Sequence, residues 1–316
     1  MNRLAQRRNL WFLISGVLLL PGIVSLVVFG LNFGIDFTGG SAWEIQFTES
    51  VDVSDIRATL AEAGRPEAQV QQVGDEEDHR YLIRMHELAE SSPEKSRLTE
   101  ALETLAPMQP DGESLETVGA SVGTSIRNRS VIAVAAASIG VLLYIAWAFR
   151  NTGNPLLYGT CAIVAMLHDA LFVLGVFSIL GVVADVEIDA LFVTAMLTVI
   201  GFSVHDTIVV FDRMRENRQF DPETSLETIV NRSLVQTLVR SINTSVTVVF
   251  TLTALLLFGG DSTRYFVLAL LLGVIAGTYS SIFNASQLLV AWNEGEIQRA
   301  FRRLTRRPEP EARASA

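Results

Sequence analysis

The chain contains six long apolar segments and one stretch in which apolar and polar residues alternate with changing periodicity. The apolar segments cover roughly 10–31, 130–149, 156–183, 188–212, 239–259 and 265–291. Each is long enough to cross a hydrocarbon core of about 30 Å as an α-helix. The pattern therefore predicts a polytopic α-helical membrane protein with six transmembrane helices. The first segment lacks a small-residue cleavage site, so we expect a retained helix and not a removed signal peptide.

The stretch between the first two apolar segments switches between strand-like and helix-like periodicity. Its predicted elements are a strand at 41–49, a helix at 52–64, strands at 68–74 and 79–85, a helix at 92–107 and a strand at 114–123. The order strand, helix, strand, strand, helix, strand is that of a ferredoxin-like α+β fold. We therefore expect an α+β ferredoxin-like domain between helices 1 and 2.

Charge adds an orientation to this picture. The net charge is −10, yet the acidic residues gather in the mixed stretch, whereas arginines flank the opposite ends of the apolar segments. By the positive-inside rule both termini are cytoplasmic and the α+β domain is external, on the periplasmic side. The predicted organisation is a cytoplasmic arm at 1–9, helix 1 at 10–31, the external domain at 32–128, helices 2–6 at 129–292 and a cytoplasmic tail at 293–316.

Several classes of chemistry are disfavoured by the composition. The single cysteine, Cys161, cannot form an intrachain disulfide, and zinc or iron–sulfur ligand spacings are absent from the sequence. There is no P-loop pattern, and Lys95 is the only lysine, so we do not expect ATP hydrolysis. The acidity of the external domain argues against nucleic-acid binding. We expect no metal, no cofactor and no enzymatic activity.

The most informative candidate residue is Asp206, which lies inside the fourth apolar segment. A carboxylate at the centre of a lipid-facing helix costs about 3 kcal/mol, so such residues usually face a bundle interior and serve a function. The expected partner is Arg240 in the next apolar segment, because both residues lie roughly 18 positions, or about 27 Å, from the same membrane face. Thr244 follows Arg240 by one helical turn and shares its face. The three residues form a predicted polar track.

The third apolar segment contains His168 and Asp169 near the membrane midplane. Adjacent helical residues point about 100° apart, so the two cannot both face one neighbouring helix. Two interpretations remain open: part of a proton path, or a locally satisfied polar plug that locks the bundle. His205, beside Asp206, is a further candidate for the proton path.

Three shorter stretches complete the pattern. GIDFTGG follows the first apolar segment, and its Gly34, Asp36, Gly39 and Gly40 indicate either tight functional backbone geometry or only a helix stop and strand entry. DPETSLETIV (221–230) predicts an amphipathic surface helix with Pro222 in its first turn. The small and hydroxyl residues of the last segment predict close helix packing, with a water-lined path as the alternative.

These motifs together resemble a known family. GIDFTGG, LHD in the third segment, TVIGFSVHDTIVVFDRMREN in the fourth, VRSINTS in the fifth and GTYSSIF in the sixth occur in the order of the SecF family, subunits of the bacterial SecDF protein-export complex within the resistance-nodulation-division superfamily. The resemblance implies proton coupling through Asp206, Arg240 and Thr244. It also implies a separate SecD-like six-span partner that completes a twelve-helix unit. His205 departs from the asparagine that many relatives carry.

The function that the resemblance implies is that of a subunit in a proton-motive-force-driven accessory complex of the bacterial cytoplasmic (inner) membrane. Such a complex promotes preprotein translocation through the SecYEG channel, after or alongside the ATP-driven step, by coupling proton flow at Asp206 and Arg240 to motion of the external domain. The expected partners are SecD, SecYEG, the preprotein and a YidC-type insertase, and the coupling ion is the proton. Half of a proton-coupled small-molecule exporter and a non-transducing translocon scaffold are the alternatives.

Overall fold

The computed structural model describes residues 5–74, 76–150, 152, 154–296 and 299, and its contacts form two compact units. The first unit, the helical bundle, consists of Met1–Leu31, Val134–Asp185 and Leu191–Ala316. The second, the α+β domain, consists of Asn32–Ala133 and Val186–Ala190. Residues 1–4 of the predicted arm and most of the predicted tail lie outside the described residues.

Six described helical segments are long and apolar enough to span a membrane, as the hydropathy pattern predicts. Five are the helices α1 (Arg8–Val28, preceded by the 3-10 turn η1, Ala5–Arg7), α5 (Ala120–Ala148), α6 (Pro155–Val183), α7 (Ala190–Phe220) and α8 (Leu226–Phe258). The sixth is continuous through α9 (Arg264–Ser280), the π-helical turn η5 (Ser281–Ala285) and α10 (Ser286–Asn293), after the short turn η4 (Asp261–Thr263).

Two helix starts differ most from the prediction. The last strand of the α+β domain ends at Val118, and α5 already begins at Ala120, within the stretch predicted to be strand up to 123. The expected surface helix with Pro222 in its first turn is also wrong, because Pro222 precedes α8, whose cap is Ser225. Charged residues at a membrane exit remain helical because water and headgroups solvate them there, so polarity alone does not mark the end of a helix.

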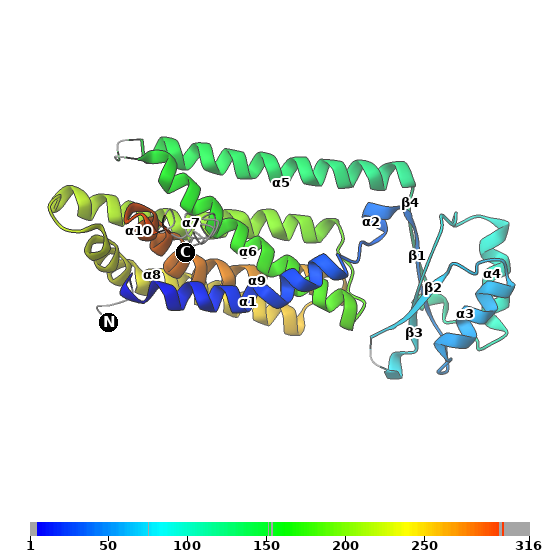
Figure 1. The fold of residues 1–316 in the computed structure, drawn as a ribbon. Helices are drawn as coiled ribbons and strands as arrows, with labels where there is room; N and C mark the ends of the chain where they lie inside the picture. Colours follow the sequence, from blue (N-terminus) through cyan, green and yellow to red (C-terminus); the bar gives the residue numbers. More distant parts are fainter. Residues whose placement is uncertain (1–4, 75, 151, 153, 297–298, 300–316) are drawn as a thin grey trace, which may run out of the picture. The chain divides into compact units, whose positions relative to one another are not determined.

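The α+β domain contains one four-stranded antiparallel sheet. Its elements, in chain order, are the short helix α2 (Ile35–Thr38), β1 (Gly40–Gln46), α3 (Val53–Glu62), β2 (Gln69–Val73), the turn η2 (Glu76–Asp78), β3 (Arg80–Met85), α4 (Pro93–Glu103), the turn η3 (Pro110–Gly112) and β4 (Ser114–Val118). The strand order is β2-β3-β1-β4, with Trp43 of β1 opposite Ile83 of β3 and Leu115 of β4. Helices α3 and α4 cover one face of the sheet (Figure 1). This topology confirms the predicted ferredoxin-like domain.

The core of this domain follows from strand alternation and helix caps. Every second residue of β1 and β3 is buried, and these side chains pack against the apolar faces of α3 and α4. Asp52 Oδ1 accepts the Ser54 amide at 2.7 Å at the start of α3, and Ser92 Oγ accepts the Lys95 amide at 3.2 Å at the start of α4. Both caps satisfy backbone donors that a helix leaves free. The largest fully buried side chains are Trp43, Ile45, Phe47, Ile56, Leu60, Tyr81, Ile83, Leu88 and Leu98.

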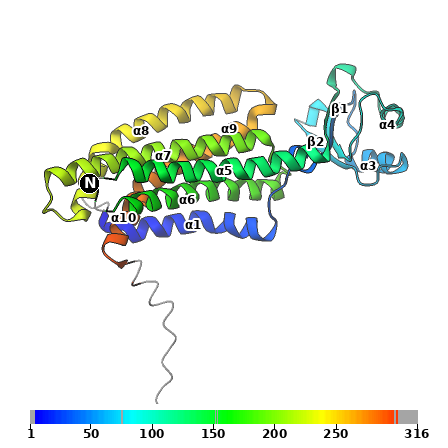
Figure 2. The same cartoon turned by 90° about the horizontal axis from the view of Figure 1, so that it is seen from above.

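The helical bundle is centred on α6, α7 and α9, whereas α1, α5 and α8 lie at its periphery. Figure 2 shows α1 and α8 along opposite margins of the bundle over most of their length. Helix α1 crosses α6 at a pair of glycines: a Cβ added to Gly22 would lie 2.8 Å from the Cα atom of Gly175. Nearby, Ser25 and Ser178 share a hydrogen bond of 2.8 Å between their hydroxyls. Small residues thus allow the close helix contact that transmembrane packing favours.

Candidate functional site

Asp206 projects from α7 into the helical bundle and is 5% exposed. Its Oδ2 atom is buried and accepts no hydrogen bond within the described part of the chain. The hydroxyl of Ser241, on α8, is buried and unbonded in the same way. A buried carboxyl oxygen without a hydrogen bond is costly, because its hydration is lost without replacement.

Arg240 and Thr244 lie on the exposed side of α8. The Thr244 hydroxyl donates to the Arg240 carbonyl oxygen at 3.0 Å, which places both residues on one helix face as predicted. None of the ion pairs among the described residues involves Arg240. The expected ion pair between Asp206 and Arg240 is thus not formed among the described residues. Equal depth does not fix the rotation of two helices, and here Asp206 is buried whereas Arg240 is exposed.

Arg240 begins a row of exposed polar side chains on α8, which we call the α8 polar stripe. Its members are Arg240, Asn243, Thr244, Thr247 and Thr251. The spacing of three or four residues puts them on one face of the helix. An arginine exposed to hydrocarbon is expensive, so such a face is expected to contact protein or water. On α7, His205 is likewise exposed, whereas its neighbour Asp206 is buried.

His168 and Asp169 take part in a second polar cluster, deep in the bundle. The Asp169 carboxylate accepts the Ser203 hydroxyl of α7 at 2.5 Å and the Ser280 hydroxyl of α9 at 2.6 Å, both at Oδ2. Its Oδ1 atom lies 3.0 Å from Nδ1 of His168. Asp169 is fully buried, and Nε2 of His168 is buried without a hydrogen-bond partner among the described residues. We call these four residues the Asp169 cluster; it joins three helices.

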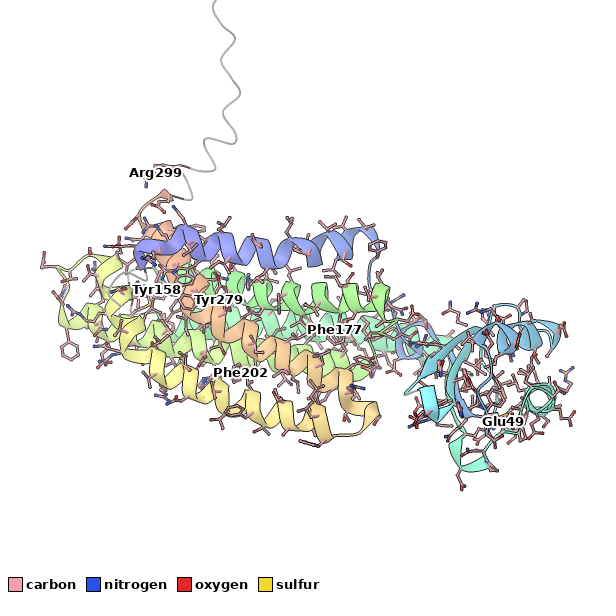
Figure 3. All side chains as sticks on the ribbon, turned by 90° about the horizontal axis from the view of Figure 1, so that it is seen from below. Glu49, Tyr158, Phe177, Phe202, Tyr279 and Arg299 are labelled. Carbon is pink, nitrogen blue, oxygen red and sulfur yellow. The ribbon has the colours of Figure 1, made fainter. Side chains whose placement is uncertain are left out.

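Polar contacts continue from this cluster toward α1. The His168 ring lies 6.2 Å from the ring of Tyr279, which is labelled within the bundle in Figure 3. The Tyr279 hydroxyl donates to the carbonyl oxygen of Trp11 at 2.8 Å, and the Ser15 hydroxyl donates to Oδ1 of Asn284 at 2.9 Å. Asn284 belongs to the π-helical turn η5, and such turns often occur at functional positions.

The glycines of GIDFTGG occupy their positions for different structural reasons. Gly39 and Gly40 adopt φ angles of +75° and +119°, which favour glycine. A Cβ on Gly40 would also lie 2.7 Å from the Met85 carbonyl oxygen. Gly34 is buried and donates its amide to the Ile188 carbonyl oxygen at 2.9 Å. Asp36 is half-buried and accepts the Ala190 amide at 2.8 Å.

The sequence did not identify the partners of Asp169. In the sequence, Ser280 is only one of the small and hydroxyl residues that predict close packing, and Ser203 is not marked as its counterpart, although both donate to the same carboxylate oxygen. A single sequence does not indicate that hydroxyl groups on two distant segments bind the same carboxylate. The expected close packing of the last segment is confirmed at Gly277, where an added Cβ would lie 3.2 Å from the Cα atom of Ser203.

Comparison with known families places this arrangement in context. Residues 98–295 match the family described as protein export membrane protein SecD/SecF, C-terminal, and residues 24–51 match the SecD/SecF GG motif. Protein translocase subunit SecF of Thermobaculum terrenum is 53% identical over 98% of each chain. The subunit of the same name from Anaerolinea thermophila is 40% identical over 96% of this chain and 98% of its own length.

Solved structures give the same family. The crystal structure of SecDF, a translocon-associated membrane protein from Thermus thermophilus, superimposes with a TM-score of 0.79 at 33% sequence identity. It covers 92% of this chain, which in turn spans only 38% of that chain. The super-membrane-facing form of SecDF gives a TM-score of 0.61 at 31% identity. The motifs, the six spans, the ferredoxin-like domain and these relatives agree: the chain is a multi-pass inner-membrane protein of the SecF family, within the SecD/SecF protein export membrane proteins.

Proposed function

We propose that this chain is the SecF-type half of an accessory complex that uses proton entry to promote preprotein translocation. The observation that carries the proposal is the buried Asp206 carboxyl, whose Oδ2 has no hydrogen-bond partner in the described chain. A carboxyl group in this position is stable either when protonated or when a cation approaches it. It can therefore alternate between two states as protons arrive and leave.

A SecD-like six-span subunit is the proposed partner. Members of the family occur as fused SecDF chains, such as that of Bacillus subtilis, of which this chain covers 38% at 34% identity. The α8 polar stripe supports a protein neighbour, because Arg240 and its hydroxyl and amide companions would otherwise face lipid. The partner would supply the remaining half of a twelve-helix unit and complete the Asp206 site.

In the proposed cycle, Asp206 is protonated from the outside and loses its attraction to Arg240 of α8. Deprotonation restores the charge and draws the guanidinium back, and the Thr244 hydroxyl on the same face can exchange its bond to the Arg240 carbonyl oxygen for one to the carboxylate. One charge crossing a potential of 100 mV supplies about 2.3 kcal/mol, which biases a two-state element roughly fiftyfold. The energy of proton entry is thus sufficient to switch the helices. His205, exposed beside Asp206, is a second proposed proton carrier.

The α+β domain is proposed to lie outside the membrane, with both termini in the cytoplasm. Its net acidity and the arginines at the far end of α7 support this orientation. We further propose that the domain handles a preprotein that emerges from SecYEG, with a YidC-type insertase as a neighbour. The chain acts as a transport subunit and not as an enzyme, and it needs no cofactor other than protons.

The test is the completion of a trapped preprotein's translocation into inverted vesicles, with ATP removed and a proton gradient imposed. Vesicles with the wild-type chain and its partner should complete translocation, and vesicles with Asp206→Asn should not. Equal completion by both would favour the non-transducing scaffold. A deletion strain rescued for export by Asp206→Asn but sensitive to small toxic compounds would favour the exporter alternative.

A further inference from the structure

Segments of the chain that are distant in sequence meet at Gly34–Gly40 in the α+β domain; we call this stretch the GG segment. The Ile188 amide, just before α7, donates to the Asn32 carbonyl oxygen at 2.9 Å, and the Gly34 amide donates to the Ile188 carbonyl oxygen at 2.9 Å. Phe33 and Ile188 thereby form a parallel β-bridge. The five residues Val186–Ala190 consequently belong to the α+β domain although they lead into a membrane helix.

Two side-chain contacts reinforce this backbone pairing. Asp36 Oδ2 accepts the amide of Ala190, the first residue of α7, at 2.8 Å. The carboxylate satisfies one of the free donors at the helix start and complements the positive end of the helix dipole. Arg84 of β3 forms an ion pair with Glu187, with 2.9 Å between Nε and Oε1. Their side chains are 16% and 19% exposed, so water screens this pair only partly.

The start of α5 packs against the same segment. A Cβ on Gly39 would lie 2.6 Å from the Cα atom of Ala120, the first residue of α5. A Cβ on Gly123 would lie 2.8 Å from the Gly39 nitrogen. Backbone therefore lies directly against backbone, without side chains that could take up small displacements. A shift of either helix start would be passed to the GG segment and to β1, which begins at Gly40.

We propose that the GG segment is the junction that passes movement of α7 to the α+β domain, with Asp36, Arg84 and Glu187 as positioning residues for transport. This proposal rests on the proposed function, because α7 carries Asp206. A helix is stiff along its axis, so a displacement at Asp206 reaches Ala190 on the same helix. The contacts of Asp36 and Arg84 hold residues 187–190 within the α+β domain.

The first test compares Asp36→Ala with Asp36→Asn and with the control Asp55→Ala. Alanine removes the acceptor of the Ala190 amide, whereas asparagine keeps one carbonyl oxygen for it. Asp55 is an exposed carboxylate of α3 whose removal leaves the junction intact. Two quantities are measured on the full chain with its partner in liposomes: amide hydrogen exchange of residues 186–191, and proton-driven completion of a trapped preprotein.

We expect Asp36→Ala to raise the amide exchange rate of residues 186–191 about fivefold, because losing one helix cap costs about 1 kcal/mol. The rate of proton-driven export should fall by at least the same factor. Asp36→Asn and Asp55→Ala should stay within about twofold of wild type, since both keep an acceptor for the Ala190 amide. If Asp36→Ala exchanges faster but exports at the wild-type rate, the proposed role of the GG segment is wrong. It is also wrong if Asp36→Ala leaves the exchange rate unchanged. A wild-type chain without proton-driven export would instead overturn the proposed function, and the junction with it.

The second test reverses the ion pair. Arg84→Glu and Glu187→Arg should each lower export, because each brings like charges together, and the double variant should regain most of it. Rescue in the double variant would show that the two side chains act through their mutual contact, because two independent defects would add. Two impaired single variants with an equally impaired double variant, at wild-type amounts of membrane-inserted protein, would remove the pair from the proposal.

Discussion

Asp169 on α6 accepts a hydrogen bond from Ser280 on α9 at 2.6 Å, one residue before the π-helical turn Ser281–Ala285. The same carboxylate oxygen accepts Ser203 of α7, so one side chain links the three central helices of the bundle. In a membrane, apolar surfaces gain little from leaving lipid, and interhelical hydrogen bonds of this kind help to select which helix faces meet. The Asp169 cluster therefore helps to determine which faces of α6, α7 and α9 pack together.

Removing one donor of this cluster should destabilise the bundle. Ser280→Ala is expected to lower the free energy of unfolding by about 1–3 kcal/mol, because the Asp169 carboxyl loses a partner in a buried position. Cys161 is buried, and it is the single cysteine of the chain, so a thiol-reactive dye reports unfolding on heating. Ser138→Ala is the matched control, since among the described residues the Ser138 hydroxyl bonds only within α5, to Val134. An equal fall in melting temperature for both variants would contradict the interhelical role.

The two interpretations of His168 and Asp169 can be separated by Asp169→Asn. Full burial and two hydroxyl donors favour the polar plug, so this variant should unfold at lower temperature yet keep its export rate per folded molecule within about twofold. The measurement is proton-driven export, normalised to folded protein from the dye assay. Loss of export in a fully folded Asp169→Asn protein would place Asp169 on the proton path.

Arg240→Lys tests the geometry of the proposed Asp206 site. Lysine keeps the charge but lacks the planar fork of five donors, so export should fall by about tenfold or more. Thermal stability should change little, because Arg240 is exposed and forms no ion pair with a described residue. Arg232→Lys is the control on the same helix, where the exposed Arg232 lies 3.6 Å from Asp221. Wild-type export by Arg240→Lys would reduce the role of Arg240 to that of a simple positive charge.

The crossing of α1 and α6 gives a test of packing. Gly175→Ala places a Cβ 2.7 Å from the Cα atom of Gly22, and backbone must move to accept it. We expect a loss of about 1–3 kcal/mol in the free energy of unfolding. Gly140→Ala in α5 has open space around the added methyl and should be neutral or slightly stabilising. A tolerated Gly175→Ala would show that the two helices can separate at little cost.

The cap of α3 should show a pH dependence of known sign. Hydrogen bonds from the hydroxyl and the amide of Ser54 hold the pKa of Asp52 below its usual range. A carboxyl with a lowered folded-state pKa stabilises the fold above its unfolded pKa of about 3.9, and this stabilisation is lost as pH falls through the folded value. Exchange protection of Val53–Glu62, corrected for intrinsic rates, should therefore be higher in wild type than in Asp52→Ala at neutral pH. The difference should shrink in acid.

An Asp52→Asn protein provides the check on this interpretation. Asparagine caps a helix without a charge, so its protection of α3 should not follow the titration of a carboxyl group. If wild type and Asp52→Asn lose protection in parallel as the pH falls, another group is responsible for the acid sensitivity. The charge of Asp52 would then make no contribution to the stability of α3.

Local patterns in the sequence determined the elements and their order. The apolar runs fix six spans because a helix must cover the hydrocarbon thickness. The alternation within β1 and β3 marks both as strands because each has one buried face. Arg240 and Thr244 share a face for an equally local reason, since four residues make about one helical turn.

Only the tertiary structure decided which of these faces meet. Lipid accepts apolar side chains on every side of a helix, so polarity does not reveal that α6 turns Asp169 toward Ser203 and Ser280, or that α7 buries Asp206 while α8 leaves Arg240 exposed. Packing of small residues and hydrogen bonds between distant segments set those rotations, and neither leaves a periodic trace in the sequence. The joining of Asp36 to the first turn of α7 has the same origin.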